Sequence, residues 1–250
     1  MNRRHALKLL AGAAAACPLC GGAAQAASAG PHWDYGTGHG GPAHWGQLSA
    51  DFGACSSGMQ QSPIDLKSGV RAELKPVRLA YGQVPLKVVN NGHTIQVDCP
   101  DGNAMTVGSE TFKLLQFHFH HPSEHRLDGR SFELERHFVH RNGAGDLAVL
   151  GVFGAANPVI DAIWRVMPAE AGEAAGQGAI DLNGLLPQER QHFLYHGSLT
   201  TPPCSEGVHW RVLPAPMEIS REQVARFAAL FPTNARPVQE LRRRFLLESR

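Results

Sequence analysis

The alternation of histidine with phenylalanine in the run Phe117-His118-Phe119-His120 constrains the fold more than any other feature of this sequence. On a β-strand, residues i and i+2 project to the same face, so the two histidines share one face and the two phenylalanines share the other. A second alternating run, residues 135–140, carries His137. If the two runs pair as neighbouring strands, three imidazoles meet on one face of a sheet.

Three converging imidazoles are a candidate metal site. Zn²⁺ binds nitrogen ligands tetrahedrally, and catalytic zinc sites use three protein ligands and leave the fourth position open. A single histidine is more often a surface residue or a hydrogen-bonded core residue. That explanation is weaker for three histidines on apolar strands, because a buried imidazole without a partner is unfavourable. From spacing alone, a metal site and a structural role remain equally open for His118, His120 and His137.

Two polar residues accompany the candidate ligands. Gln116 lies two residues before His118, and Glu135 lies two residues before His137, so each is expected on the same strand face as its histidine. A metal-binding histidine commonly donates its other ring N–H to such an acceptor, which fixes its tautomer and orientation. The two acceptors favour the catalytic interpretation.

Strand-like apolar runs recur along the chain and are separated by turn residues such as Asn90-Asn91-Gly92 and Asp101-Gly102. We expect strands at residues 86–89, 94–99, 104–107, 112–120, 132–140, 147–153 and 208–213. The segment from about Pro31 to Pro63 has little periodicity, and we expect it to be irregular and anchored by Trp33, Tyr35 and Trp45.

Two helices are expected beside the strands. Asn157 is a suitable cap for a helix with Pro158 in its first turn. Ser220 and Gln223 form a capping box for a second helix, which must end before Pro232. Many strands, few helices and the lack of a βα alternation predict a mainly β (α+β) single domain built on a largely antiparallel sheet.

The first thirty residues differ from the rest. The Arg3-Arg4 pair precedes a small, apolar stretch over residues 9–20, and Ala24-Gln25-Ala26 offers a cleavage site. This pattern predicts that residues 1–26 are a secretory signal peptide, and the arginine pair favours the twin-arginine route. The residue two positions after the pair is not the expected aromatic residue or leucine, so an ordinary signal peptide stays open. We expect a periplasmic or secreted protein.

The predicted mature domain, residues 27–250, carries little net charge. The whole chain has 23 basic and 22 acidic residues, and the predicted signal peptide removes three basic residues and no acidic one. We therefore expect no nucleic-acid partner. Arg242-Arg243-Arg244 is a short basic run for which a solvated or structural role is expected. No apolar run after the first thirty residues is long enough to span a membrane.

Five cysteines divide into two groups. Cys17 and Cys20 fall inside the apolar N-terminal stretch and are not interpreted as a metal or redox motif. Cys55, Cys99 and Cys204 remain in the predicted mature chain, where an oxidising compartment would allow two of them to pair. Spacing alone does not choose among the three pairings.

Several separated motifs together resemble the α-class carbonic anhydrases, in the order found in that family, from about His32 to Arg243. They are Gln61-Ser-Pro-Ile-Asp65, Asn90-Asn-Gly-His93, Gln116-Phe-His-Phe-His120, Ser123-Glu-His125, Glu135-Arg-His-Phe-Val-His140, Leu147-Ala-Val-Leu-Gly151 and Gly197-Ser-Leu-Thr-Thr-Pro-Pro203. The resemblance implies a central twisted sheet of about ten strands, mostly antiparallel, with Zn²⁺ at the bottom of a cleft. It also implies reversible hydration of carbon dioxide to bicarbonate and a proton, by attack of zinc-bound hydroxide.

The resemblance assigns roles to individual residues. His118, His120 and His137 match the zinc ligands, and Gln116 and Glu135 match the acceptors behind them. Three further matches are catalytic: Thr200 as the hydrogen-bond acceptor for the hydroxide, Glu124 as the acceptor for the threonine proton, and His93 as the proton shuttle. Matches to the substrate-binding wall are Val139, Val149, Leu199, Thr201, Val208 and Trp210.

The resemblance also implies a disulfide between Cys55 and Cys204, which leaves Cys99 unpaired. Sulfonamide or anion inhibitors are expected on the same basis, and the chain is expected to be a monomer or a homodimer. The competing hypothesis is a non-enzymatic module that keeps the fold to bind another protein. Intact Thr200 and Glu124 speak against it, because a scaffold needs neither.

Overall fold

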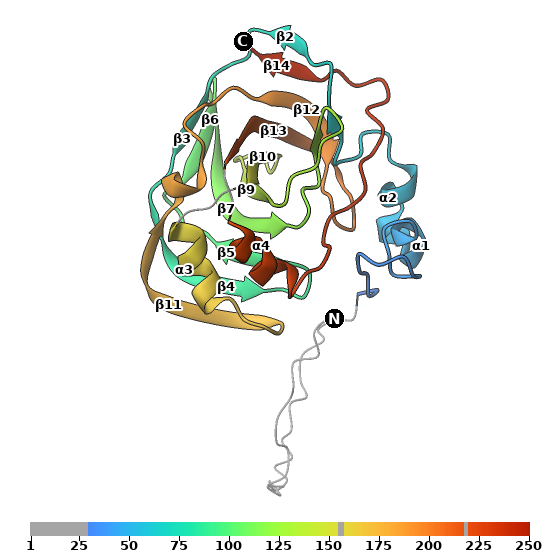
Figure 1. The fold of residues 1–250 in the computed structure, drawn as a ribbon. Coiled ribbons are helices and arrows are strands. Elements are labelled where there is room, and N and C mark those ends of the chain that lie inside the picture. The colour runs from blue at the N-terminus through green and yellow to red at the C-terminus, as the bar shows by residue number, and fades with distance from the viewer. Residues whose placement is uncertain (1–29, 155–157, 218–219) are drawn as a thin grey trace, which may run out of the picture. The chain divides into compact units, whose positions relative to one another are not determined.

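The computed structural model describes residues 30–154, 158–217 and 220–250. The predicted signal peptide and Asn157 lie outside these residues, so both stay predictions. From Pro31 onward the chain is one compact unit built on a twisted, mixed sheet of twelve strands (Figure 1). The fold class expected from the sequence is confirmed, with two strands more than the expected number.

The main path of the sheet runs from β11 at one edge to β2 at the other. The main path is β11-β4-β5-β7-β9-β10-β13-β12-β14-β2, with β3 and β6 joined to it through β7, while β1 and β8 form a separate pair. The strands are β1 (Asp65–Leu66), β2 (Val70–Ala72), β3 (Val77–Ala80), β4 (Gln83–Asn90), β5 (Ile95–Asp98), β6 (Ala104–Val107), β7 (Glu110–His120), β8 (Arg126–Leu127), β9 (Glu135–Arg141), β10 (Leu147–Gly154), β11 (Gly172–Asp181), β12 (Phe193–Ser198), β13 (Glu206–Met217) and β14 (Leu247–Ser249).

Every strand expected from alternation is present, with shifted ends. The expected strand over residues 132–140 begins only at Glu135, where β9 starts. Several strands were not expected, among them β11, whose sequence is rich in glycine and alanine, which have low strand propensity. Most neighbours are antiparallel, but β10 pairs with β13 in parallel, as β14 does with β2.

Helices are short and few among the described residues. They are α1 (Trp45–Leu48), η1 (Ala50–Phe52), α2 (Ala54–Ser57), α3 (Pro158–Val166), η2 (Leu182–Leu185) and α4 (Arg221–Ala228). None of them is long and apolar enough to cross a membrane. The expectation of an irregular segment before Pro63 is wrong in part, because three of these short helices lie in it. Trp45 is completely buried there, and the ring of Trp33 packs edge-on against it.

The cap of α4 is the one that the sequence predicts, and α4 also contacts α3. Ser220 is the N-cap of α4, and its hydroxyl accepts a hydrogen bond from the Gln223 backbone N–H at 3.1 Å. The Gln223 side chain donates to Asp161 Oδ1 of α3 at 2.7 Å, and Trp164 Nε1 of α3 donates to the Gln223 carbonyl at 2.9 Å. The two helices therefore hold each other against the sheet.

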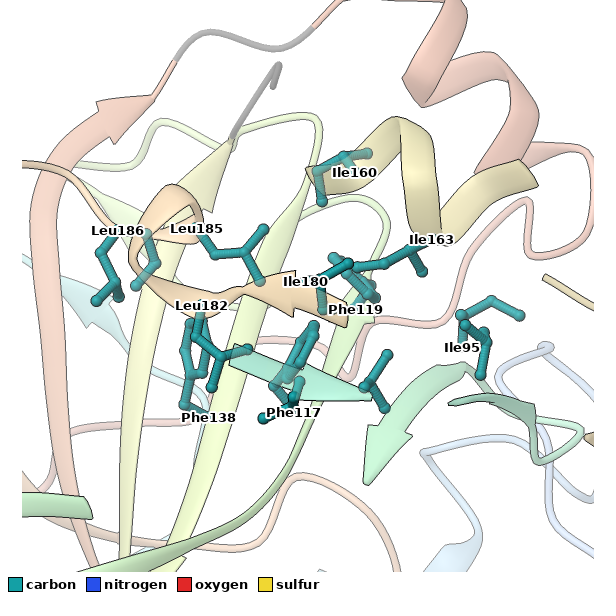
Figure 2. Packing of buried hydrophobic residues seen from close by; sticks show 14 of the residues in the cluster. Ile95, Phe117, Phe119, Phe138, Ile160, Ile163, Ile180, Leu182, Leu185 and Leu186 are labelled. Atoms are coloured by element: carbon teal, nitrogen blue, oxygen red, sulfur yellow. The ribbon is translucent and has the colours of Figure 1, made fainter. Parts of the chain in front are cut away.

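The phenylalanines of the alternating run form the core beneath α3. Phe117 stacks on Phe138 of β9 with ring centroids 5.3 Å apart, and Phe119 meets Trp164 edge-on at 4.7 Å. Figure 2 shows these phenylalanines together with Ile160 and Ile163 of α3. One face of β7 is thus committed to the apolar core, which leaves the histidine face on the opposite side of the sheet.

Replacing Phe119 with alanine tests whether this face of β7 contributes to the stability of the core. Phe119 is completely buried, so Phe119→Ala should destabilise the fold by about 3–5 kcal/mol through lost transfer energy and a cavity. Denaturant unfolding measures the difference. Phe245→Ala is the matched control, because Phe245 is 78% exposed and its loss should change stability little. Equal effects of the two substitutions would contradict the assignment.

Candidate metal centre

Strands β7 and β9 bring the three candidate ligands together. They are antiparallel, with His118 directly opposite His137 and His120 directly opposite Glu135. The three imidazole rings converge, with centroids 4.5 to 5.4 Å apart. One ring nitrogen from each histidine lies within 4.8 Å of the others. The register between β7 and β9 therefore brings the three histidines together.

Each ring has a hydrogen-bond acceptor at its other nitrogen. His118 Nδ1 lies 2.9 Å from Gln116 Oε1, and His137 Nε2 lies 2.9 Å from Glu135 Oε1. His120 Nδ1 lies 2.8 Å from the carbonyl oxygen of Asn234. These oxygens only accept, so each contacting nitrogen carries the proton. The lone pairs of His118 Nε2, His120 Nε2 and His137 Nδ1 are therefore free to bind a cation.

Burial favours the neutral form of His118 and His120. Burial lowers the pKa of His118 well below its usual value, and repulsion from the neighbouring His120 and His137 lowers it further. Burial also lowers the pKa of His120, against the opposing effect of the Glu124 carboxylate. Neutral imidazole is the form that binds a metal, so no proton must be displaced near neutral pH.

The residues present fit a zinc ion. His120 Nε2 and Glu124 Oε2 are buried and have no hydrogen-bond partner. Glu124 Oε2 lies 3.5 Å from His120 Nε2 and 3.7 Å from His137 Nδ1. A buried polar atom without a partner costs about 1–3 kcal/mol, which a cation bound to the free lone pairs would offset. Three imidazole nitrogens with an open fourth direction are the donor set of a catalytic zinc site.

A second group, His125 with Glu135 and His137, is a hydrogen-bond network rather than a metal site. His125 Nδ1 and His137 Nε2 lie 2.7 and 2.9 Å from the same oxygen, Glu135 Oε1. Two ligands of one zinc ion, each about 2.0–2.2 Å from it, would lie farther apart than this. The His125 backbone N–H also donates to Glu135 Oε2 at 2.8 Å.

Glu135 is fully buried and ionised. Burial acts to raise its pKa, but the neighbouring His125 and His137 outweigh this and hold the pKa of Glu135 well below its usual range. His125 extends the network, because its Nε2 lies 2.7 Å from the Tyr195 hydroxyl. The sequence assigns no role to His125. Only its complete burial between a carboxylate and a hydroxyl shows that it positions Glu135.

Thr200 and Glu124 are both buried, but the hydrogen bond expected between them is not formed. Both side chains are buried, and Glu124 Oε1 accepts a hydrogen bond from the Arg236 backbone N–H at 2.8 Å. Glu124 Oε2 stays free to accept. Among the hydrogen bonds of the described residues, none joins Thr200 to Glu124. The roles of both residues remain predictions.

The loop that carries Thr200 is tied down at several points. The Cys55–Cys204 disulfide joins it to α2 across 149 residues of sequence, and Gln61 Nε2 donates to the Cys204 carbonyl at 3.1 Å. The pairing implied by the resemblance is therefore present. Cys99 is unpaired, and burial raises the pKa of its thiol to about 12.

A pocket of about 140 Å³ opens beside the histidines. It is lined by Trp33, Tyr35, Asn91, His93, Thr94, Gln96, Gln116, His118, His120 and Thr201. His93 is half-buried and stacks flat on Trp33, with ring centroids 3.7 Å apart. Burial lowers the pKa of His93, and His32 lowers it further, against the opposing charge of Asp34. His93 therefore shares a pocket with two of the candidate ligands.

The apolar candidates lie on the other side of the ligands. Val139, Val149 and Trp210 are direct neighbours across β9, β10 and β13. The Trp210 ring centroid is 4.8 Å from that of His137. Leu199 and Val208 pack in the same apolar cluster. Of the six predicted substrate-binding residues, only Thr201 lines the pocket beside His93.

Residues 40–250 match the family model described as eukaryotic-type carbonic anhydrase. The chain belongs to the carbonic anhydrase family. A carbonic anhydrase of Pectobacterium carotovorum is 43% identical over 221 residues, which cover 86% of this chain and 90% of the relative. A carbonic anhydrase of Nostoc sp. is 44% identical over 231 residues, covering 87% of this chain and 86% of the relative.

The fold of this carbonic anhydrase also matches solved structures. The α-carbonic anhydrase of Thermovibrio ammonificans, solved in complex with the inhibitor sulfanilamide, has a TM-score of 0.83 and 45% identity, covering 87% of this chain and 99% of that one. Family, relatives and structure agree on the enzyme class, a carbon dioxide-hydrating lyase.

Gly151 allows the close approach on which His137 depends. It lies directly opposite His137 on β10, and a Cβ at this position would come within 2.9 Å of Glu135 Oε1. The carboxylate cannot move aside easily, because His125 and His137 hold it.

Gly151→Ala should therefore displace Glu135 and weaken zinc binding about 10–100-fold, which is the usual effect of losing such a supporting contact. Competition with a chromophoric chelator measures the affinity. Gly143→Ala is the control, because a Cβ there meets nothing within 4 Å. Unchanged zinc affinity in Gly151→Ala would show that the site does not need this space.

Proposed function

We propose that this carbonic anhydrase hydrates carbon dioxide at a zinc ion held by His118, His120 and His137. The observation that carries the proposal is the convergence of three imidazoles, each with a hydrogen-bond acceptor at its other nitrogen. When bound, zinc supplies a Lewis acid that lowers the pKa of a water molecule from about 15.7 to roughly 7. Neutral ligands leave its full charge available for this.

Thr200 and Glu124 orient the attacking oxygen in this proposal. An ionised carboxylate only accepts hydrogen bonds, and Glu124 Oε1 already accepts one from Arg236. If Thr200 donates its proton to the free Glu124 Oε2, the threonine oxygen is left to accept a hydrogen bond from the nucleophile. The nucleophile then presents a lone pair, rather than a proton, to the carbon of carbon dioxide.

The apolar residues suit an uncharged substrate. Carbon dioxide has no hydrogen-bond donor and no net charge, so a wall of Val139, Val149, Val208 and Trp210 binds it without leaving polar groups unpaired. The contact of the Trp210 ring with His137, at 4.8 Å between centroids, supports this role for the wall. Leu199 and Thr201 complete the set on the loop that the Cys55–Cys204 disulfide tethers.

We further propose that His93 carries the released proton to buffer. His118 and His120 line the same pocket as His93. Histidine is the side chain suited to accept and release protons near neutral pH, and the lowered pKa of His93 favours release of the proton to buffer. Stacking on Trp33 holds the ring at the side of the pocket. Export to the periplasm or beyond rests on the predicted signal peptide and is supported by the disulfide, which persists in oxidising compartments.

A ligand substitution tests the proposed site. His118→Ala should lose zinc and lower carbon dioxide hydration by more than about a hundredfold, since loss of a supporting contact alone costs up to that much. Metal analysis and stopped-flow hydration on the protein without residues 1–26 provide the two readouts. Sulfanilamide should inhibit the unmodified protein. His39→Ala, at an exposed histidine, is the control.

The outcomes also separate an enzyme from a binding module. A fully zinc-loaded protein with no hydration above the buffer rate would refute the proposal and favour the module. Zinc retained at full stoichiometry by His118→Ala would refute the ligand assignment alone.

The proton path is tested separately. His93→Ala should slow turnover in weak buffer by up to about 100-fold, the lower end of the usual contribution of a proton-transfer group, and added imidazole should restore part of it. Hydration in strong buffer should change little. Equal rates for His93→Ala and the unmodified protein in weak buffer would mean that another group transfers the proton.

A further inference from the structure

A groove lies beside the arginine run for which the sequence predicts only a solvated or structural role. One part is a cavity of about 380 Å³, lined by Gln60, Leu194, Tyr195, His196, Arg243, Arg244, Phe245 and Leu247. The other is a cavity of about 530 Å³, lined by Met59, Gln60, Arg242, Arg243 and Arg244. The two cavities are adjacent, because they share Gln60, Arg243 and Arg244, and we call them together the arginine groove. Figure 1 shows the C-terminal segment that forms its wall, in red, running from α4 to β14.

The rim of the arginine groove is apolar and exposed. Phe245 is 78% exposed and Met59 is 58% exposed. Within the described residues, only three large apolar side chains are exposed to this degree, and the third is Val70. Two of the three therefore border one groove. Exposed apolar groups concentrated beside charged residues are typical of a binding surface.

Nearby carboxylates offset the positive charge of the groove only in part. Glu206 accepts a hydrogen bond from the Gln60 backbone N–H at 2.6 Å and interacts electrostatically with Arg244, but not with the other two arginines. The Arg244 guanidinium is fixed by donation to the carbonyl oxygens of Glu240, Leu241 and His196. Arg242 Nε is 3.9 Å from Glu240 Oε2, a long contact between exposed groups that contributes little. In the part of the chain that the structure describes, Arg243 has neither a hydrogen bond nor an ion pair.

This charge is a local property. The whole chain has 23 basic and 22 acidic residues, so three consecutive arginines stand out against a nearly neutral protein. Arginine presents a rigid fork of donors that matches a carboxylate, and it is enriched at protein interfaces for that reason. The groove thus offers carboxylate-binding donors next to apolar surface.

We propose that the arginine groove binds an extended acidic segment of a partner protein, in which carboxylates alternate with apolar side chains. The carboxylates would pair with Arg242 and Arg243, and an apolar side chain would enter the cavity beside Leu194, Leu247 and Phe245. The concave shape of the arginine groove favours a peptide over a lipid surface, because a flat membrane cannot enter a cavity. The volumes lie within the range of about 300–1,000 Å³ that is usual for ligand sites.

A designed peptide probe tests the proposal. A fluorescein-labelled peptide of alternating glutamate and leucine is titrated against the protein without residues 1–26, with fluorescence anisotropy as the readout. Binding should saturate at about 0.05 M salt and weaken at about 0.5 M, because salt screens the charges. A peptide with lysine in place of glutamate should not bind.

Two variants locate the binding. The double variant Arg242→Glu/Arg243→Glu should weaken peptide binding at least about tenfold, because like charges then face each other. Phe245→Ser should weaken it by a smaller factor. Arg78→Glu is the matched control at an exposed arginine on β3, and it should leave the affinity unchanged. Thermal melting confirms that each variant is folded.

Several results would overturn the proposal. The first two are a lack of saturable peptide binding at low salt and an unchanged peptide affinity in the double variant. The third is tighter binding to phosphatidylglycerol vesicles than to the peptide, if the variants lose vesicle binding to the same extent. The fourth is a dimer in analytical sedimentation that the same variants dissociate, which would mean that a second copy occupies the groove. Arg242, Arg243 and Phe245 take no part in the metal centre. Hydration activity should therefore persist in all variants, and the two proposals can fail independently.

Discussion

The register between β7 and β9 is the constraint on which the rest of the site depends. It sets His118 opposite His137, while Phe117 lies opposite Phe138 on the other face. A slip of one residue would exchange the faces and place imidazoles in the apolar core. The stacked phenylalanines under α3 therefore fix the positions of the ligands. The core stabilises the fold and specifies the metal centre through the same strand pair.

One irregularity in β7 precedes this regular stretch. The pairing of β7 with β9 shifts between Leu114 and Gln116, where one residue is inserted into the ladder. Leu114 is thereby turned to the core, while Gln116 faces the histidine side, although both are even-numbered. Such a bulge re-aims side chains locally. The alternation around the histidines predicts the strand, but it carries no sign of the extra residue.

Half of the fourteen strands, β4 to β7 with β9, β10 and β13, can be predicted from the sequence, because they carry alternating or continuous apolar runs. Strands without a strong alternation escape detection, as β11 does with its glycines and alanines. Parts of the site escape for a different reason. The acceptor for His120 is the backbone carbonyl of Asn234, and the donor to Glu124 is the backbone N–H of Arg236. Backbone groups belong to every residue, so only the fold shows that they are used.

Hydrogen bonds within the protein already fix the side chains around the candidate site without an ion. Glu135 is ionised inside the core because His125 and His137 hold it, and His125 is placed in turn by Tyr195. By contrast, the protein supplies no partner for His120 Nε2 or Glu124 Oε2. At about 1–3 kcal/mol for each buried atom, this deficit is a sizeable fraction of the stability of a typical domain, which is about 5–15 kcal/mol. Complete satisfaction behind the ligands, with a deficit confined to their front, directs binding to a single point. The hydrogen-bonded side sets the geometry of the candidate ligands, and the unsatisfied side is where the proposed ion would bind.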